Sequence, residues 1–202
     1  MTFGGWNKFI AALGQTNLLL CIILMILVNC FNIIQSTFLP LFFISVYGVK
    51  TSMLSILPLL KSITTILVYL MITSRIQLHS IRHPLLIGLG SYLCGLSMLL
   101  LCIPLGSKAI GVVFISAVFD ALAAAILVPL YETMMSVSIP DNIRARANSL
   151  ITAIILLICI PVGWLSGILS QQNRILPLAV NFSIIIVQII VVWFITRNSR
   201  KK

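Results

Sequence analysis

The chain is a series of long apolar runs separated by short polar segments. A membrane-spanning helix needs about 20 predominantly apolar residues, and six of these runs are long enough. They predict transmembrane helices at residues 17–46, 52–74, 84–104, 109–138, 147–170 and 177–196. The linkers are short, as they are between antiparallel neighbours in a helical bundle. We therefore expect an all-α, polytopic membrane bundle of six transmembrane helices that forms a single domain over residues 1–202.

The composition supports this interpretation. Of the 202 residues, 60% are hydrophobic and 8% are charged, whereas soluble domains are about 45–50% apolar and about 25% charged. So much apolar surface excludes a soluble enzyme, an extracellular domain and a disordered tail, and it makes the lipid bilayer the first expected partner. The segment before the first apolar run lacks the charged start of a signal peptide, and the run itself is too long for one, so no cleavable signal is expected.

The net formal charge of +10 is best explained by membrane topology. The basic residues form neither a stripe nor a known nucleic-acid fold signature, so no nucleic-acid partner is expected. Cytoplasmic loops of membrane proteins collect Lys and Arg, and the two sides of the six-span topology carry nine and three of them. This asymmetry predicts a multi-pass protein of the cell membrane with both termini in the cytoplasm. The side with three carries Lys50, Lys108 and Arg174.

Three stretches resemble one known family. Ser138–Ser149 reads SIPDNIRARANS, Ile160–Leu169 reads IPVGWLSGIL, and Ser36–Gly48 reads STFLPLFFISVYG. The first resembles the P-x-x-x-R-[GA]-x-[AG]-x-[SG] junction between spans ten and eleven of major facilitator superfamily transporters. The second is similar to the eleventh span of that family, and the third looks like its seventh. The chain thus resembles the C-terminal six-helix half of a twelve-span transporter.

The segment between the second and third runs departs from the family pattern. The family carries G-x-x-x-D-[RK]-x-G-[RK] after its second span and a degenerate copy in its C-terminal half. Residues 75–84 read RIQLHSIRHP, with the arginines but with neither Asp nor Gly. This fits a C-terminal half, in which no gating role can rest on that Asp.

The resemblance implies a fold and a mechanism. Each half of such a transporter is a 3+3 inverted repeat, and the substrate site lies between two six-helix halves that give alternating access. A short internal echo agrees with the repeat, because Phe38–Phe42 (FLPLF) recurs 89 residues later as Leu127–Tyr131 (LVPLY). One half cannot enclose a small-molecule substrate alone. We therefore expect a second half, supplied by a longer chain, a second copy or a separate partner.

Lys61 and Asp120 are the sharpest functional candidates. Both lie near the predicted membrane midplane, where a lone charge costs at least about 2.5–3.5 kcal/mol. The lysine side chain is too short to reach the nearer interface, so we expect the two to pair. Small residues around Asp120 let another helix approach closely. The pair is either a fixed structural ion pair or part of the substrate and proton pathway.

The first span carries a polar stripe within about 120° of arc. It consists of Asn29, Asn32, Gln35 and Ser36. Because lipid cannot satisfy these groups, they either face a substrate cavity, as the resemblance implies, or bond to neighbouring helices. Tyr131, on the Asp120 face of the fourth span, is a further candidate for the pathway.

Two other features of the spans predict contacts. Glu132 lies nearer the cytoplasmic end of the fourth span, where we expect a cytoplasmic gate with one of three arginines. These are Arg75, Arg82 and Arg144. The motifs Ser91-x-x-x-Gly95 and Gly163-x-x-x-Gly167 are expected to be close-contact surfaces between helices.

The sequence offers no catalytic or metal-binding constellation. His79 and His83 lie in a loop, with Ser80 where a zinc-protease helix has Glu. Asp120 and Glu132 are about 18 Å apart by helix rise, too far for a carboxylate pair. The five cysteines lie in apolar runs without a C-x-x-C pair and are expected to be small buried hydrophobes. We expect no enzymatic activity, no metal and no cofactor.

The hypothesis from sequence is secondary active transport of a small molecule by alternating access, with the chain as a half or fragment of a major-facilitator-type transporter. The substrate, the direction (efflux included) and the coupling ion stay open. One alternative is the six-span substrate-binding membrane component of a vitamin uptake complex. The other is a non-transporting membrane assembly protein, in which Lys61 and Asp120 would tolerate joint replacement by Leu.

The charge asymmetry makes a prediction about orientation. Single cysteines placed at Lys50, Lys108 or Arg174 in a cysteine-free background should react with an impermeant maleimide added outside intact cells. A single cysteine at Arg146 should react only after the membrane has been opened. The reverse labelling pattern would contradict the orientation.

Overall fold

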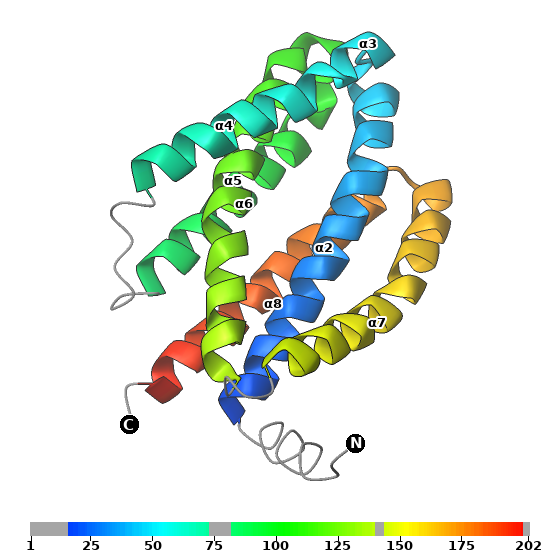
Figure 1. The fold of residues 1–202 in the computed structure, drawn as a ribbon. Coiled ribbons are helices and arrows are strands. Elements are labelled where there is room, and N and C mark those ends of the chain that lie inside the picture. The colour runs from blue at the N-terminus through cyan, green and yellow to red at the C-terminus, as the bar shows by residue number, and fades with distance from the viewer. Residues whose placement is uncertain (1–15, 73–81, 140–143, 200–202) are drawn as a thin grey trace.

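The computed structural model describes residues 16–72, 82–139 and 144–199. The helices are α2 (Thr16–Tyr47), α3 (Thr51–Leu54), α4 (Ile56–Ile72), α5 (Arg82–Leu101), the 3₁₀ segment η2 (Ile103–Ala109), α6 (Ile110–Ser138), α7 (Arg144–Gln172) and α8 (Leu176–Ser199) (Figure 1). No β-strand occurs in these three described ranges. The all-α prediction is therefore confirmed.

Six helical segments are long and apolar enough to cross a membrane. They are Leu18–Tyr47, Thr51–Met71, His83–Leu101, Ile103–Val137, Arg144–Gln172 and Leu176–Phe194. The predicted spans agree with them except at some boundaries. The expected link between the third and fourth spans is the 3₁₀ segment η2, which bends at Gly106 (φ 52°) and continues into α6. The protein is a polytopic bundle of six apolar helices.

The helices α2 and α6 run through the centre of the bundle. In Figure 1, α4 lies on one side of them, against α6, and α7 lies on the other side, against α2. Behind them α5 packs on α6, α8 packs on α2, and α5 also contacts α8. The contacts thus form two matching sets, in which α4 and α5 pack on α6 as α7 and α8 pack on α2. The start of α2 and the end of α8 lie at the same end of the bundle.

Apolar side chains of α2, α5, α6 and α8 form the main core. Phe31, Phe42, Leu89, Leu127 and Ile185 are among its fully buried members. A smaller cluster around Ile151, Ile155 and Cys159 joins α7 to α2. By contrast, α4 is the least buried of the six spans, and of its side chains whose burial is described only Leu57 and Val68 are buried. Its position therefore depends on few apolar contacts.

Small residues let α5 and α6 approach closely. A Cβ added at Gly95 would lie 3.3 Å from both Phe119 Cβ and the Ser116 carbonyl oxygen, and one at Gly88 would lie 2.6 Å from Leu127 Cγ. The predicted contact surface at Ser91-x-x-x-Gly95 is confirmed, and Gly88 extends it towards the other end of α5.

The second small-residue motif is only half right. A Cβ at Gly163 would lie 3.7 Å from Ile33 Cγ2 on α2, which is an ordinary contact, whereas no atom lies within 4 Å of one at Gly167. The two glycines share a face of α7, so the contact with α2 at Gly163 does not continue one turn further to Gly167.

The far end of α2 is fixed to α5. The Tyr47 hydroxyl donates to the Leu99 carbonyl oxygen at 2.5 Å, and the Tyr47 side chain is fully buried. Gly48 follows with φ 65°, a backbone conformation that L side chains rarely adopt. The amides of Gly48 and Val49 then bond back to the carbonyls of Ile44 and Phe43 at 3.2 Å each, which closes the helix end.

The close approach of α5 to α6 makes a prediction about stability. Gly95→Val should overpack the interface and cost about 1–3 kcal/mol, which lowers the Tm of the detergent-solubilised protein by several degrees. Gly90→Val is the matched control, because Gly90 lies on the same helix with nothing within 4 Å of an added Cβ. Equal losses in the two variants would show that the α5–α6 contact is not responsible.

Candidate functional site

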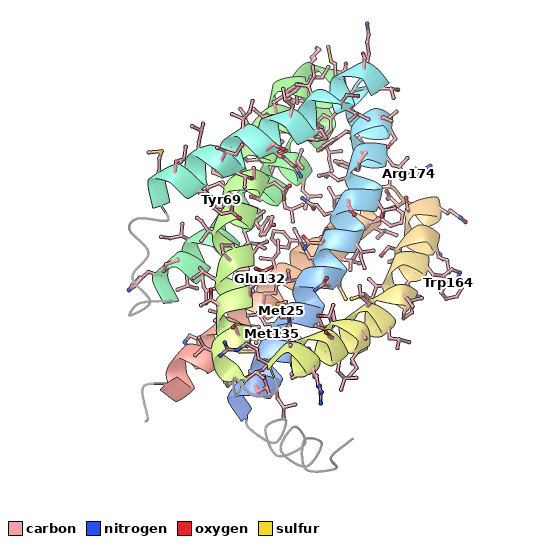
Figure 2. The ribbon with its side chains drawn as sticks, in the orientation of Figure 1. Met25, Tyr69, Glu132, Met135, Trp164 and Arg174 are labelled. Atoms are coloured by element: carbon pink, nitrogen blue, oxygen red, sulfur yellow. The ribbon has the colours of Figure 1, made fainter. Side chains whose placement is uncertain are left out.

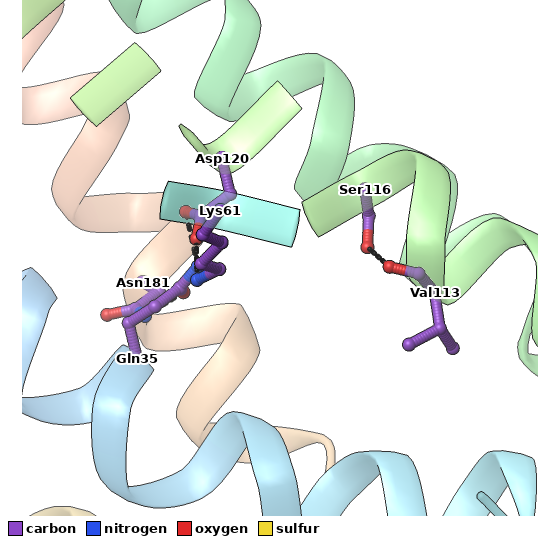
Figure 3. Close-up of polar contacts among 6 residues, drawn as sticks. All are labelled: Gln35, Lys61, Val113, Ser116, Asp120 and Asn181. Carbon is purple, nitrogen blue, oxygen red and sulfur yellow. Dashed lines mark hydrogen bonds and ion pairs between the residues drawn. The ribbon is translucent and has the colours of Figure 1, made fainter. Parts of the chain in front are cut away.

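Lys61 and Asp120 meet in the middle of their spans. Lys61 is the central residue of Thr51–Met71, and Asp120 is the central residue of Ile103–Val137. The Lys61 Nζ donates to Asp120 Oδ2 and so joins α4 to α6 (Figure 3). The pairing expected from their matched depth is confirmed. It matters for α4, because a charge left alone in this apolar layer would be strongly destabilising.

A second helix holds the other oxygen of the carboxylate. Gln35 on α2 donates its Nε2 to Asp120 Oδ1 at 2.7 Å, and Asn181 on α8 donates its Nδ2 to Gln35 Oε1 at 3.2 Å. Because the amide oxygen of Gln35 accepts the hydrogen bond from Asn181, the amide NH₂ of Gln35 is the group that faces Asp120. Figure 3 shows these side chains converging from α4, α6, α2 and α8. We call Lys61, Asp120, Gln35 and Asn181 the polar network.

The polar network is open at one end and closed at the other. The Lys61 side chain is 35% exposed and the Asp120 side chain 13%, whereas Asn181 is 1% exposed. The buried Oδ1 of Asn181 accepts no hydrogen bond from the described residues. Gln35 is half-buried, so the network is most exposed at Lys61 and closed at Asn181.

A narrow cleft borders Asp120 on the side of the bundle core. Its polar lining groups are Gln35, Asp120, Tyr92 and Ser116, and the rest of the lining is made of Gly95 and apolar residues of α2, α5 and α6. Its water-accessible space is about 10 Å³, roughly what one water molecule needs. Ser116 bonds to the Val113 carbonyl oxygen of its own helix at 2.8 Å (Figure 3). The cleft has no room for a solute.

The predicted polar stripe of α2 splits into different environments. Only Gln35 joins the polar network. Asn29 donates to the Met25 carbonyl oxygen at 2.8 Å, and the exposed Ser36 donates to the Ile33 carbonyl oxygen at 3.2 Å, both within α2. Asn32 is exposed. Gln35 thus bonds between helices, while Asn32 and Ser36 present polar groups on the outside of the isolated chain.

The remaining candidates stay outside the network. Tyr131 is buried, and its hydroxyl has no hydrogen-bond partner among the described residues. Glu132 is exposed on α6 and makes no ion pair with any described side chain (Figure 2). Of the arginines proposed for the gate, Arg144 lies in the first turn of α7 rather than in a loop. Arg75 and the side chain of Arg82 lie outside the described residues, so the gate stays a prediction.

Sequence reasoning missed Asn181 and one contact between cysteines. A buried carboxamide in an otherwise apolar span was the available signal for Asn181, because lipid cannot satisfy it; Gln188 on the same helix is also buried. Cys30 on α2 and Cys159 on α7 are buried, with their Sγ atoms 3.5 Å apart. The expectation that all five cysteines are buried is wrong for Cys94, which is exposed, and for Cys102, which is only half-buried.

No protein-family model, curated protein or solved structure matches this chain. Within the described ranges, no three His, Cys, Asp or Glu side chains gather into a metal site.

The Lys61–Asp120 pair makes a prediction about folding. Lys61→Leu and Asp120→Leu should each lower the Tm, because each leaves one charge without its partner. The loss should stay below the about 3–5 kcal/mol typical of fully buried pairs, since Lys61 is partly exposed. The double variant should recover most of the loss in a double-mutant cycle. Ser62→Leu controls for adding a Leu to the exposed face of α4, and strictly additive losses would contradict the coupling.

Proposed function

We propose that this chain is one six-helix half of a secondary active transporter of the major facilitator type, which moves a small molecule by alternating access. The observation that carries the proposal is a charged network in the middle of the spans, open at Lys61. Intramembrane charges are expensive, and they mark substrate, ion and proton pathways. A purely structural bundle gains little from such a pair, since apolar residues of similar volume are often as stabilising.

The helix arrangement supports the family assignment. If α2, α4 and α5 form one triplet and α6, α7 and α8 the other, the contact of α4 with α6 corresponds to that of α7 with α2. In the same way, α5 with α6 corresponds to α8 with α2. A 3+3 inverted repeat produces this pairing. Pro40 and Pro129, which lie 89 residues apart in the sequence echo, occupy corresponding places inside the long helices α2 and α6.

The exposed faces support a second six-helix half as the partner. The two least buried spans, α4 and α7, correspond to each other in the two triplets and lie on opposite sides of the α2–α6 pair. Asn32 and Ser36 on α2 are exposed as well. Lipid would leave the Asn32 carboxamide unsatisfied, whereas a second half facing α2 would enclose both residues in a solvated cavity. That half belongs to a longer chain, a second copy or a separate partner.

In this mechanism a bound solute weakens or rearranges the Lys61–Asp120 ion pair. Without solute, Lys61 holds the thinly packed α4 against α6 through Asp120. A solute that bonds to the network alters the balance between the two orientations of the halves, because it binds them with different free energies. Coupling to an ion or proton would act through the same groups.

Alternating access predicts a labelling pattern that needs no knowledge of the substrate. In a cysteine-free chain, Asn32→Cys and Ser36→Cys should each react with a charged, impermeant methanethiosulfonate in both right-side-out and inside-out vesicles, because a cavity presents them to each side in turn. Trp164→Cys is the control and should stay unreactive, since Trp164 is 69% exposed on the outer side of α7 and faces lipid in this proposal (Figure 2).

Any other labelling pattern contradicts transport by alternating access and favours one of the two alternative functions. Reaction from one side only is expected of a substrate-binding component that does not alternate by itself. No reaction at Asn32→Cys and Ser36→Cys from either side is expected of a membrane assembly protein, whose polar face is covered by a permanent neighbour.

A further inference from the structure

The two partners of the central ion pair differ in what they can still bind. Both oxygens of the Asp120 carboxylate already accept a hydrogen bond, one from Gln35 and one from Lys61. The Lys61 ammonium has three N–H donors, and Asp120 is its one acceptor among the described residues. The donor capacity left at this site therefore belongs to Lys61, whose remaining N–H groups are available to a further acceptor.

Lys61 is also the partner that a solute reaches more easily. Lys61 is the more exposed of the two side chains, and the space on the core side of Asp120 holds about one water molecule. A solute that enters the bundle from its open side therefore meets the ammonium before the carboxylate. A cation approaching Asp120 meets the repulsive charge of the more exposed Lys61, whereas an anion can bond to Lys61 while the pair stays intact.

The rest of the charge pattern also disfavours a cation. The chain has three acidic residues, Asp120, Glu132 and Asp141. Glu132 lies on the same helix as Asp120 but about 18 Å away by helix rise, and Asp141 lies outside the spans and the described residues. No second carboxylate of the described spans can thus join Asp120 in holding a positive ligand. Asn32, one turn from Gln35 and exposed on α2, is uncharged and can donate to an anion through its amide NH₂.

We propose that the polar network is a binding site for a small organic anion, whose carboxylate or similar acidic group bonds to the Lys61 ammonium from the open side. Asp120, Gln35 and Asn181 are positioning residues in this site, because they hold Lys61 in place through a chain of hydrogen bonds that ends at the buried Asn181 of α8. Lys61 sits in the middle of its span, where lipid headgroups do not reach. The ligand is therefore a solute and not a lipid. This inference rests on the proposed function, since it assigns a substrate class to the same site.

Three probes of nearly equal size separate the possibilities. The full chain is placed in phosphatidylcholine nanodiscs, and its Tm is followed while benzoate, benzylammonium or benzyl alcohol is added. A ligand that binds only the folded state raises the Tm progressively with its concentration. Benzoate should raise the Tm by several degrees at saturation, whereas benzylammonium and benzyl alcohol should leave it unchanged or lower it equally in all variants.

Variants locate the effect at Lys61. Lys61→Arg keeps the positive charge and should keep the benzoate response, and Ser62→Met, on the neighbouring exposed position of α4, should keep it too. Lys61→Met should lose the response. Because Lys61→Met alone leaves Asp120 unpaired and can fail to fold, the Lys61→Met/Asp120→Leu variant is measured beside it and should also show no response.

Every other outcome overturns the assignment. A response to benzylammonium alone would make this a cation site, and no response to any probe would leave no anion site of useful affinity. A benzoate response that persists in Lys61→Met/Asp120→Leu would show partition into the bilayer. The labelling of Asn32→Cys and Ser36→Cys is independent of this result, so two-sided labelling without benzoate binding refutes the anion site alone. Benzoate binding with one-sided labelling refutes transport alone.

Discussion

A charge cannot stay unpaired in the middle of a membrane-spanning helix, and much of the structure depends on how this chain meets that constraint. Lys61 enters the apolar layer on α4, the helix with the fewest buried side chains to position it. Its ion pair with Asp120 therefore satisfies the charge and also places α4 against α6. Hydrogen bonds from Gln35 to Asp120 and from Asn181 to Gln35 connect this ion pair to α2 and α8.

The bundle combines a tightly packed part with two outer helices. Glycines bring α5 and α6 together, and the main apolar core joins both of them to α2 and α8. This part holds Asp120 and Gln35 in fixed positions, because close-packed interiors deform little. By contrast, α4 and α7 carry little buried surface on their outer sides. The Asp120 carboxylate is held by this close-packed part, whereas the Lys61 ammonium comes from the outer helix α4. The geometry of the site can therefore change with the position of α4.

The polar face of α2 connects this geometry to the proposed partner. Asn32 and Ser36 are exposed in the single chain, although a carboxamide in contact with lipid is costly. Their exposure is explained if another six-helix unit shields them from lipid and leaves a water-filled space between. The contacts of α4 with α6 match those of α7 with α2, so such a unit would meet two similar edges.

The helices themselves were predictable from the sequence, because lipid offers the backbone no hydrogen-bond partner and an apolar run of span length must satisfy its own amides. The Lys61–Asp120 pair was predictable for a related reason, since two opposite charges at matched depth in the membrane have a lower free energy paired than apart. The sequence also placed Gln35 among four polar residues of the first span, but it did not single Gln35 out.

Only the tertiary structure decided which polar groups meet. The rotation of each helix about its axis is set by side-chain packing along its whole length, so it turns Gln35 towards Asp120 and leaves Asn32 exposed. Asn29 found its partner within its own helix, an outcome that no spacing rule distinguishes beforehand. Asn181 entered the network because α8 packs on α2, and contacts between helices so distant in sequence follow from the shape of the assembled bundle.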